Sequence, residues 1–166
     1  YFVENNISFS LLTKLGKDMQ GETHLDFLTS EYGLEEDDIL TSSAPSALSM
    51  EGTLLIKSTA PSFIKKEDVI RFIDDKNIDK IIISSLLLSF DPVRKEIIEG
   101  IEKRKDKIKR VVIDAEDSTS IIMIEDLFEG LKRISSSIKE CYISGDILNI
   151  EGVKRVSSDM IKELFI

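Results

Sequence analysis

Three carboxylates follow a short apolar segment in the middle of the chain, and residues of this type could do metal chemistry. The apolar segment is Val111-Val112-Ile113, and the acids are Asp114, Glu116 and Asp117. In an open α/β sheet the carboxyl ends of the strands line the ligand crevice, so a strand here would place these acids at its rim. Carboxylate oxygens are the ligands that Mg²⁺ prefers. A magnesium site is one interpretation, and a solvated loop that caps the next helix is the other.

A turn bounded by two glycines lies near the amino terminus, at residues 16–21. It lacks the Gly-Lys-Ser/Thr ending of a P-loop, and the carboxylate of Asp18 would repel a phosphate. Aspartate is favoured immediately before a helix, where its side chain accepts hydrogen bonds from free backbone N–H groups. We therefore predict that Gly16, Asp18 and Gly21 form a structural turn and that Asp18 caps the following helix.

The chain has one cysteine, Cys141, and one histidine, His24. A single cysteine excludes an internal disulfide and fits a reducing cytoplasm. No histidine is placed to activate Cys141, so we predict a buried strand residue and not a nucleophile. A metal cluster built on several histidines is excluded, and we expect His24 at the surface or in a helix cap.

The elements that would position these residues alternate regularly after residue 65. β-Branched runs predict strands at residues 81–85, 111–114 and 141–144. Helical patterns predict helices opening at 66–68 and at Asp91-Pro92, with Asp91 as N-cap, and others over 124–138 and 152–164. This order is typical of βαβ units with right-handed crossovers.

The first third of the chain departs from that alternation. We predict a strand at residues 7–12 and a helix at 22–32 closed by Gly33, with Leu25, Leu28, Phe27 and Tyr32 on one buried face. Residues 39–50 and 53–58 read as two strands joined at Glu51-Gly52, a turn dipeptide similar to the Asp-Gly hairpin signal. The first of these is interrupted by Pro45, which predicts an edge strand or irregular backbone. We place this hairpin as a flap beside the main sheet.

Length, composition and charge limit the kind of protein. The chain has 166 residues, of which 42% are hydrophobic and 32% are charged, and this predicts one soluble globular domain. A net charge of -9 opposes binding to nucleic acid. The basic run at residues 103–110 is either a solvated helix end or a phosphate-binding patch. No apolar stretch is long enough to cross a membrane, and the first residues lack both a signal-peptide pattern and an initiator methionine, so we expect a processed, trimmed or excised piece.

Four segments occur in an order that resembles the ribokinase-like (PfkB) sugar kinases. They are residues 11–22, with a Gly-x-Asp-x-x-Gly-Glu turn; Pro45-Ser46-Ala47; residues 51–60, which begin Glu-Gly-Thr; and residues 81–114. Pro45-Ser46-Ala47 is similar to the family's Pro-Thr-Gly, which precedes a lid strand over the sugar. It keeps a hydroxyl at Ser46 but has an alanine in place of the glycine.

The resemblance implies roles for particular residues. It implies substrate binding at Ser46 and Lys57, and it places the turn of Gly16, Asp18 and Gly21 near the cleft. Residues 111–117 resemble a strand that ends in Asp-Pro-Asn, which implies a nucleotide and magnesium rim at Asp114, Glu116 and Asp117. Two departures disfavour ordinary kinase activity: Ala115 and Glu116 replace the Pro-Asn pair, and Gly145 and Leu148 stand where the family has an Asn-x-x-Glu motif.

The resemblance also implies a fold and an activity. The fold is a three-layer ribokinase-like α/β sandwich, a mainly parallel sheet with helices on both faces, formed by a partial domain over residues 1–166 with residues 39–60 as a β-hairpin lid. The activity is phosphoryl transfer from ATP, with Mg²⁺, to a sugar or nucleoside hydroxyl. The family's Gly-Ala-Gly-Asp motif, which carries the catalytic aspartate, does not occur here.

Two hypotheses stay open. The chain is a fragment of an active cytoplasmic carbohydrate kinase, inactive by itself, or it is a degenerate kinase-like domain with a binding or assembly role. We expect a homodimer or self-association through the lid or an exposed sheet edge, and no nucleic-acid or membrane partner. A flavodoxin-like or receiver domain is a third option, which the hairpin before the βαβ run opposes.

Overall fold

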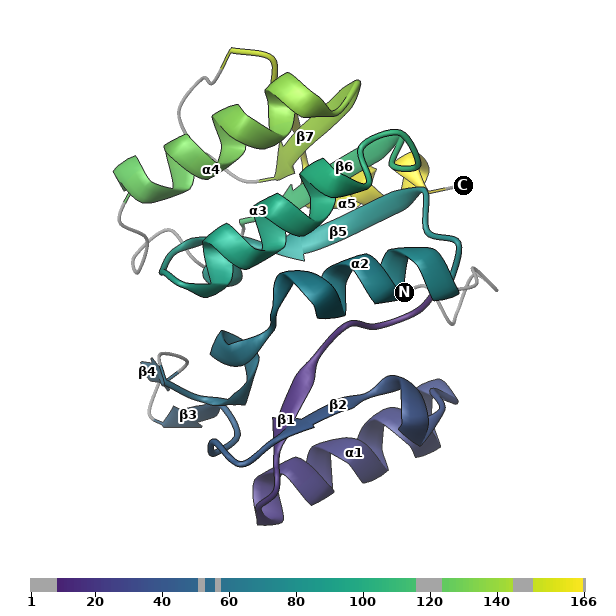
Figure 1. Cartoon of the computed structure of the whole chain (residues 1–166), viewed down its shortest axis with the longest axis vertical. Helices are drawn as coiled ribbons and strands as arrows, with labels where there is room; N and C mark the ends of the chain where they lie inside the picture. Colours follow the sequence, from purple (N-terminus) through teal and green to yellow (C-terminus); the bar gives the residue numbers. More distant parts are fainter. Residues whose placement is uncertain (1–8, 51–52, 56–57, 116–123, 145–150, 166) are drawn as a thin grey trace. The chain divides into compact units, whose positions relative to one another are not determined.

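The chain divides into two compact units, Phe2–Lys65 and Lys66–Ile166. The structure, a computed structural model, describes residues 9–50, 53–55, 58–115, 124–144 and 151–165 (Figure 1). Each unit combines parallel strands with helices, so the predicted α/β class is confirmed. Within the described ranges, no helix has the length and apolar character needed to cross a bilayer.

A four-stranded parallel sheet forms the centre of unit Lys66–Ile166. Its strands lie in the order of the sequence: β5 (Lys80–Ser84), β6 (Arg110–Asp114), β7 (Glu140–Ser144) and β8 (Lys154–Val156). The middle of β6 is completely buried: Val111, Val112 and Ile113 have no exposed surface. The three strands predicted from β-branched runs are therefore confirmed.

The long helices of this unit pack on the sheet or on one another through apolar side chains. The helices are α2 (Lys66–Asp75), α3 (Val93–Lys103) and α4 (Ile124–Ser137), with a 3₁₀ turn, η3 (Ser85–Leu88), after β5. Of these, α3 and α4 are the crossovers that join strands of the sheet. Because successive right-handed crossovers advance in one direction across the sheet, α3 and α4 lie on the same face, and both stand in front of the strands in Figure 1. Ile98 and Ile101 of α3 and Leu131 and Ile134 of α4 are almost completely buried between these layers.

α2 is joined to α3 by a hydrogen bond and by close packing. The N–H of Lys66, at the start of α2, donates to Glu96 Oε2 of α3 at 2.7 Å. Gly100 allows close approach of the two helices, since a Cβ atom at this position would lie 2.7 Å from Cβ of Val69. α2 therefore obtains its N-terminal hydrogen-bond partner from the neighbouring helix.

Two boundary predictions in this unit are wrong. Asp91 is not the N-cap of α3: the helix begins at Val93, and the Asp91 carboxylate instead pairs with Arg94 at 3.0 Å and Lys95 at 3.1 Å. The predicted terminal helix over 152–164 is also wrong in its first part, because residues 154–156 form β8 and extend the sheet beside β7. Only α5 (Ser158–Ile161) and the 3₁₀ turn η4 (Lys162–Leu164) are helical.

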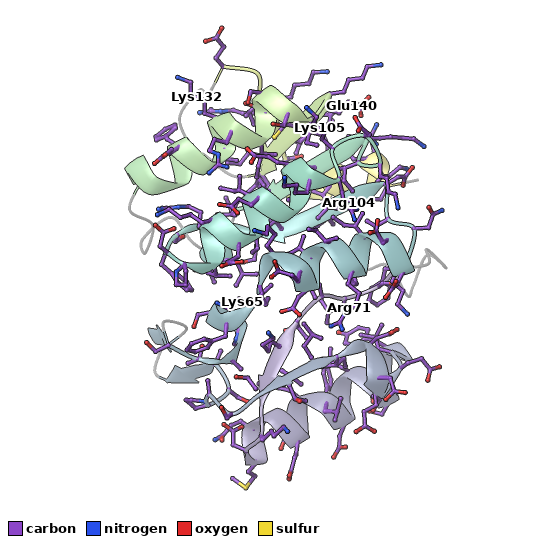
Figure 2. The ribbon with its side chains drawn as sticks, viewed as in Figure 1. Lys65, Arg71, Arg104, Lys105, Lys132 and Glu140 are labelled. Atoms are coloured by element: carbon purple, nitrogen blue, oxygen red, sulfur yellow. The ribbon has the colours of Figure 1, made fainter. Side chains whose placement is uncertain are left out.

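The basic run at residues 103–110 follows the end of α3 and leads into β6. Arg104 and Lys107 both bind the carboxylate of Asp74 at 2.6 Å, and Lys109 binds Asp79 at 2.8 Å. Arg110 donates to Glu140, at the end of the sheet where β6 and β7 begin; Figure 2 labels Arg104, Lys105 and Glu140 there. These pairs support the helix-end interpretation, since much of the run's charge is already balanced by carboxylates.

Unit Phe2–Lys65 is built on a short parallel strand pair and a separate hairpin. β1 (Lys14–Gly16) pairs in parallel with β2 (Leu40–Ser42), and α1 (Met19–Tyr32) and the 3₁₀ turn η1 (Glu36–Asp38) connect them. β3 (Leu48–Met50) and β4 (Thr53–Leu55) form the antiparallel hairpin, and η2 (Ala60–Phe63) follows. The hairpin predicted from Glu51-Gly52 is present in the strands on either side, although those two residues lie outside the described ranges.

Three predictions for this unit need correction. Among the described residues of the predicted strand at 7–12, none is in a strand, and β1 begins at Lys14, where pairing with Leu40 starts. The predicted first hairpin arm is two strands: β2 joins β1, and only β3 belongs to the hairpin. α1 ends at Tyr32 and is closed by Gly33 in the left-handed conformation, as predicted (φ 65°). Its predicted apolar face is not buried: Phe27 is 50% and Tyr32 42% exposed, and Leu25 and Leu28 are only half-buried. At about 100° per residue, Phe27 lies nearly opposite Leu25 and about a quarter-turn from Leu28, so the three side chains do not share one narrow face.

Candidate functional site

A backbone hydrogen bond joins the two segments at the base of the β3–β4 hairpin. On the second segment, the Ala60 N–H donates to the carbonyl of Pro45 on the first segment at 2.7 Å. Ser46, Thr59 and Ala60 are buried, with 6%, 7% and 0% of their surface exposed. The base of the hairpin is therefore hydrogen-bonded and buried from solvent.

Asp18 links this base to the start of α1. Its Oδ1 accepts the N–H of Gly21 at 2.8 Å, which confirms the predicted N-cap. The same carboxylate accepts the N–H of Ser46 and the hydroxyl of Ser46, each at 2.8 Å. The Ser46 hydroxyl in turn accepts the N–H of Gly16 at 2.9 Å. The backbone N–H of Ser46, then that of Gly21, then the Ser46 hydroxyl hold the pKa of Asp18 below its usual value.

Both glycines of the turn are required by the closeness of this arrangement. A Cβ atom on Gly16 would lie 2.4 Å from the Ser46 nitrogen, and one on Gly21 would lie 1.9 Å from the Gly16 carbonyl oxygen. Backbone atoms occupy these positions, so no side-chain rotation could relieve the overlap. We name the group of Gly16, Asp18, Gly21 and Ser46 the hairpin anchor.

The sequence predicted two of these contacts and missed the others. The Asp18 cap and the glycine turn follow from local spacing, whereas Ser46 is 28 residues from Asp18 and no local pattern joins them. Ser46 thus has a structural role, and its predicted contact with a substrate stays a prediction. Lys57, the other predicted substrate residue, lies outside the described residues. That the turn of Gly16, Asp18 and Gly21 borders a cleft stays a prediction.

A second group of polar residues lies at the carboxyl ends of the strands in unit Lys66–Ile166. Asp114, the last residue of β6, is exposed, and its Oδ1 accepts the hydroxyl of Ser144 at 2.9 Å. Ser144, the last residue of β7, is completely buried and also accepts the N–H of Ala115 at 3.0 Å. Sequence reasoning missed Ser144, for which the only signal was its place at the end of a predicted strand.

The fit of this rim to Mg²⁺ rests on one described acid. Asp114 supplies a hard oxygen ligand of the kind that Mg²⁺ takes. Glu116 and Asp117 lie outside the described residues. Within the ranges that the structure describes, no three His, Cys, Asp or Glu side chains are grouped so that they could hold a metal ion.

Cys141 and His24 have the environments predicted for them. Cys141 is only 2% exposed on β7, and burial raises the pKa of its thiol to about 12, which disfavours the nucleophilic thiolate. His24 is exposed on α1.

Comparison with known proteins finds similarity of structure only. No protein-family model matches the sequence, and no curated protein matches it either. A protein assigned as a 2-keto-3-deoxygluconate kinase, from Enterococcus faecalis, has a similar structure over 96% of this chain and 47% of its own, with a TM-score of 0.62 and 16% identity.

Two other solved structures give the same result. The fructokinase of Xylella fastidiosa, determined with bound ATP, matches 81% of this chain and 44% of its own, with a TM-score of 0.60 and 18% identity. The aminoimidazole riboside kinase of Salmonella enterica, in complex with aminoimidazole riboside and an ATP analogue, matches 80% of this chain and 44% of its own, with a TM-score of 0.57 and 18% identity.

The chain therefore spans less than half the length of the solved kinases that it matches. At these identities the likeness establishes architecture and leaves chemistry to be tested. Over 80% or more of its length the chain has the ribokinase-like fold found in these solved kinases, as the sequence resemblance implied.

Proposed function

We propose that this chain is a portion of an ATP-dependent carbohydrate kinase that transfers a phosphoryl group from ATP to a sugar or nucleoside hydroxyl. The observation that carries the proposal is the fold, which is shared with sugar and riboside kinases over 80% or more of this chain. Two of these kinases were determined with ATP or an ATP analogue bound. ATP is accordingly the phosphoryl donor that we propose.

The proposal assigns one role to each group of residues. The β3–β4 hairpin is the lid over the sugar, with Ser46 and Lys57 on the substrate side and the hairpin anchor holding its base. Closure of such a lid excludes water and so suppresses wasteful hydrolysis of ATP. Asp114, Glu116 and Asp117 form the nucleotide and magnesium rim, and Mg²⁺ would neutralise phosphate charge there.

The principal test is an assay of the chain as given. We expect no phosphorylation of any sugar, because the Gly-Ala-Gly-Asp motif that resemblance assigns to catalysis does not occur in it. Coupled detection of ADP release across a panel of sugars and nucleosides, with an enzyme-free blank, measures this directly. Turnover above the blank would contradict the proposed inactivity.

A degenerate kinase-like domain with a binding or assembly role is the second candidate. Ala115 and Glu116 stand in place of the family's Pro-Asn pair, and the Asp114 carboxylate already accepts a hydrogen bond from Ser144. The coding sequence downstream of residue 166 separates the two candidates, since a Gly-Ala-Gly-Asp segment there would favour the kinase.

We also propose self-association through the lid hairpin or the sheet edges. In the sheet of unit Lys66–Ile166, β5 and β8 each have one strand neighbour, and an unpaired strand edge is a template for pairing with another chain. Light scattering over a range of concentrations should show a rising mean mass. A constant monomer mass at the highest concentration would contradict this expectation.

A further inference from the structure

α1 carries large apolar side chains on its outer surface. Met19 is 73% exposed and Phe27 is 50% exposed, and both belong to the few large hydrophobic residues at the surface of the described chain. Met19, Thr23 and Phe27 are spaced four residues apart, so they form one row along the helix. The hydroxyl of Thr23 donates to the carbonyl of Met19 at 2.8 Å, which satisfies its hydrogen-bonding within the helix. The row is therefore mainly apolar.

An aromatic group adjoins this row at Phe27. The ring of Tyr32 meets the ring of Phe27 edge to face, with centroids 5.4 Å apart, and meets Phe9 in the same way at 6.3 Å. Edge-to-face contacts are favourable for aromatic pairs and hold the rings in place. A surface that is ordered before binding loses less conformational entropy when a partner arrives. We name Met19, Thr23, Phe27 and Tyr32 the α1 face.

The charged side chains of α1 and of the segment that follows it, through η1, are all acidic. Residues 19–38 contain seven acidic residues and no lysine or arginine. They are Glu22, Asp26, Glu31, Glu35, Glu36, Asp37 and Asp38, and all except Asp38 are exposed. An apolar row bordered by carboxylates is complementary to a segment that carries apolar side chains between cations.

We infer that the α1 face binds a basic segment of another protein, in which leucine-like side chains alternate with lysine or arginine at helical spacing. The acidic border repels nucleic acid and anionic membranes. A second copy of this chain is a poorer partner, because Arg104, Lys107 and Lys109 of its basic run are already paired with Asp74 and Asp79. This inference is independent of the proposed kinase activity.

Binding of a designed peptide to the chain 1–166 tests the inference. The probe is a fluorescein-labelled helical peptide with leucines at every fourth position and lysines between them, followed by anisotropy. Two matched peptides replace the lysines by glutamate or the leucines by serine. We expect only the leucine–lysine peptide to bind, with an affinity that falls as salt is raised, since opposite charges across an interface are screened.

Variants of the chain locate the binding site. Met19→Ser with Phe27→Ser should weaken binding about tenfold or more, because such anchors carry much of an interface's affinity. Glu22→Gln with Asp26→Asn and Glu31→Gln should weaken binding and reduce its salt dependence. The matched control is Met160→Ser with Glu163→Gln, which removes an apolar side chain that is 48% exposed and an exposed acid from the other unit, and should leave affinity unchanged.

Several outcomes would overturn the inference. They are failure of the leucine–lysine peptide to bind, equal binding of either matched peptide, and loss of affinity in the control variant as large as in the α1 variants. Circular dichroism checks that each variant is folded. If the serine variant is not folded, the three-site charge variant still decides the question, because its exposed side chains keep their size.

Discussion

The two units of this chain are stabilised internally by different kinds of interaction. Among the described residues, eighteen of the buried hydrophobic side chains belong to unit Lys66–Ile166 and four belong to unit Phe2–Lys65. The larger set fills the space between a parallel sheet and its helices. The smaller unit relies instead on hydrogen bonds at the hairpin anchor, where one carboxylate accepts three donors. Apolar burial is non-directional, whereas such bonds depend on exact backbone positions, so the units should respond differently to substitution.

Truncating a buried apolar side chain of unit Lys66–Ile166 should give the largest loss of stability. Ile134 on α4 has no exposed surface. We expect Ile134→Ala to lower the free energy of unfolding by about 3 to 4 kcal/mol, from lost burial and the cavity left behind. Urea denaturation followed by circular dichroism measures this, with Met160→Ala as an exposed control that should change stability by less than about 0.5 kcal/mol. A loss below about 1 kcal/mol for Ile134→Ala would argue against a closely packed core.

Adding a single methyl group should distinguish the two units next. At Gly21 the new Cβ would lie 1.9 Å from a backbone oxygen of Gly16, so Gly21→Ala should destabilise unit Phe2–Lys65 by about 2 kcal/mol or more. The matched substitution is Gly130→Ala in α4, where the nearest atom is the flexible tip of Ile98 at 3.1 Å. There the gain in helix propensity, about 1 kcal/mol, should offset the crowding.

Hydrogen exchange resolved by residue can measure both glycine variants. Faster exchange in α1 and β2 of Gly21→Ala, with unchanged exchange in α4 of Gly130→Ala, is the expected pattern. Equal effects in the two variants would show that the hairpin anchor tolerates crowding as well as the helical layer does.

Acidification should produce a smaller effect and sharpens the comparison further. The folded-state pKa of Asp18 is lowered by the N–H groups of Ser46 and Gly21, so its stabilising effect is fully present above the unfolded-state pKa of about 3.9. That effect is lost as the pH falls through the lower folded-state value. We expect Asp18→Asn to flatten the acid dependence of exchange in unit Phe2–Lys65 below about pH 4.

The counterpart in the other unit is Asp74. Hydrogen bonds from Arg104 and then Lys107 hold the pKa of its carboxyl well below the usual range. Asp74→Asn should therefore flatten the acid dependence in unit Lys66–Ile166 and leave unit Phe2–Lys65 unchanged. A shared response of both units to either substitution would show that they unfold together.

The elements predicted best from the sequence are those with a long hydrophobic pattern or with residues that are fully buried. The β-branched run of β6 and the apolar spacing of α3 were sufficient to predict these elements. When most apolar residues of a segment are buried, their spacing determines both the type of element and the face that it buries. β8 was missed because three residues are too few for alternation to be recognised, and its place depends on pairing with β7. For the same reason β2 was assigned to the hairpin instead of to β1.

The candidate site was predictable only where its contacts are local. Asp18 as N-cap follows from residue type and position, but its bonds to Ser46 depend on the fold of the intervening chain. The acid at the end of β6 was found from its strand, whereas its link to Ser144 is a contact between strands. The predicted buried face of α1 is wrong, because apolar side chains on a helix do not by themselves show which side of it meets a core.

The contact between Lys66 and Glu96 has a consequence for the order of folding. A helix of ten residues is marginal in isolation, and α2 takes the acceptor for its first N–H from a residue thirty positions further along the chain. A peptide of α2 alone should consequently be largely unstructured, and its helix should form only once α3 has been made and has docked. Through Glu96, the folding of α2 therefore depends on α3, which is synthesised after it.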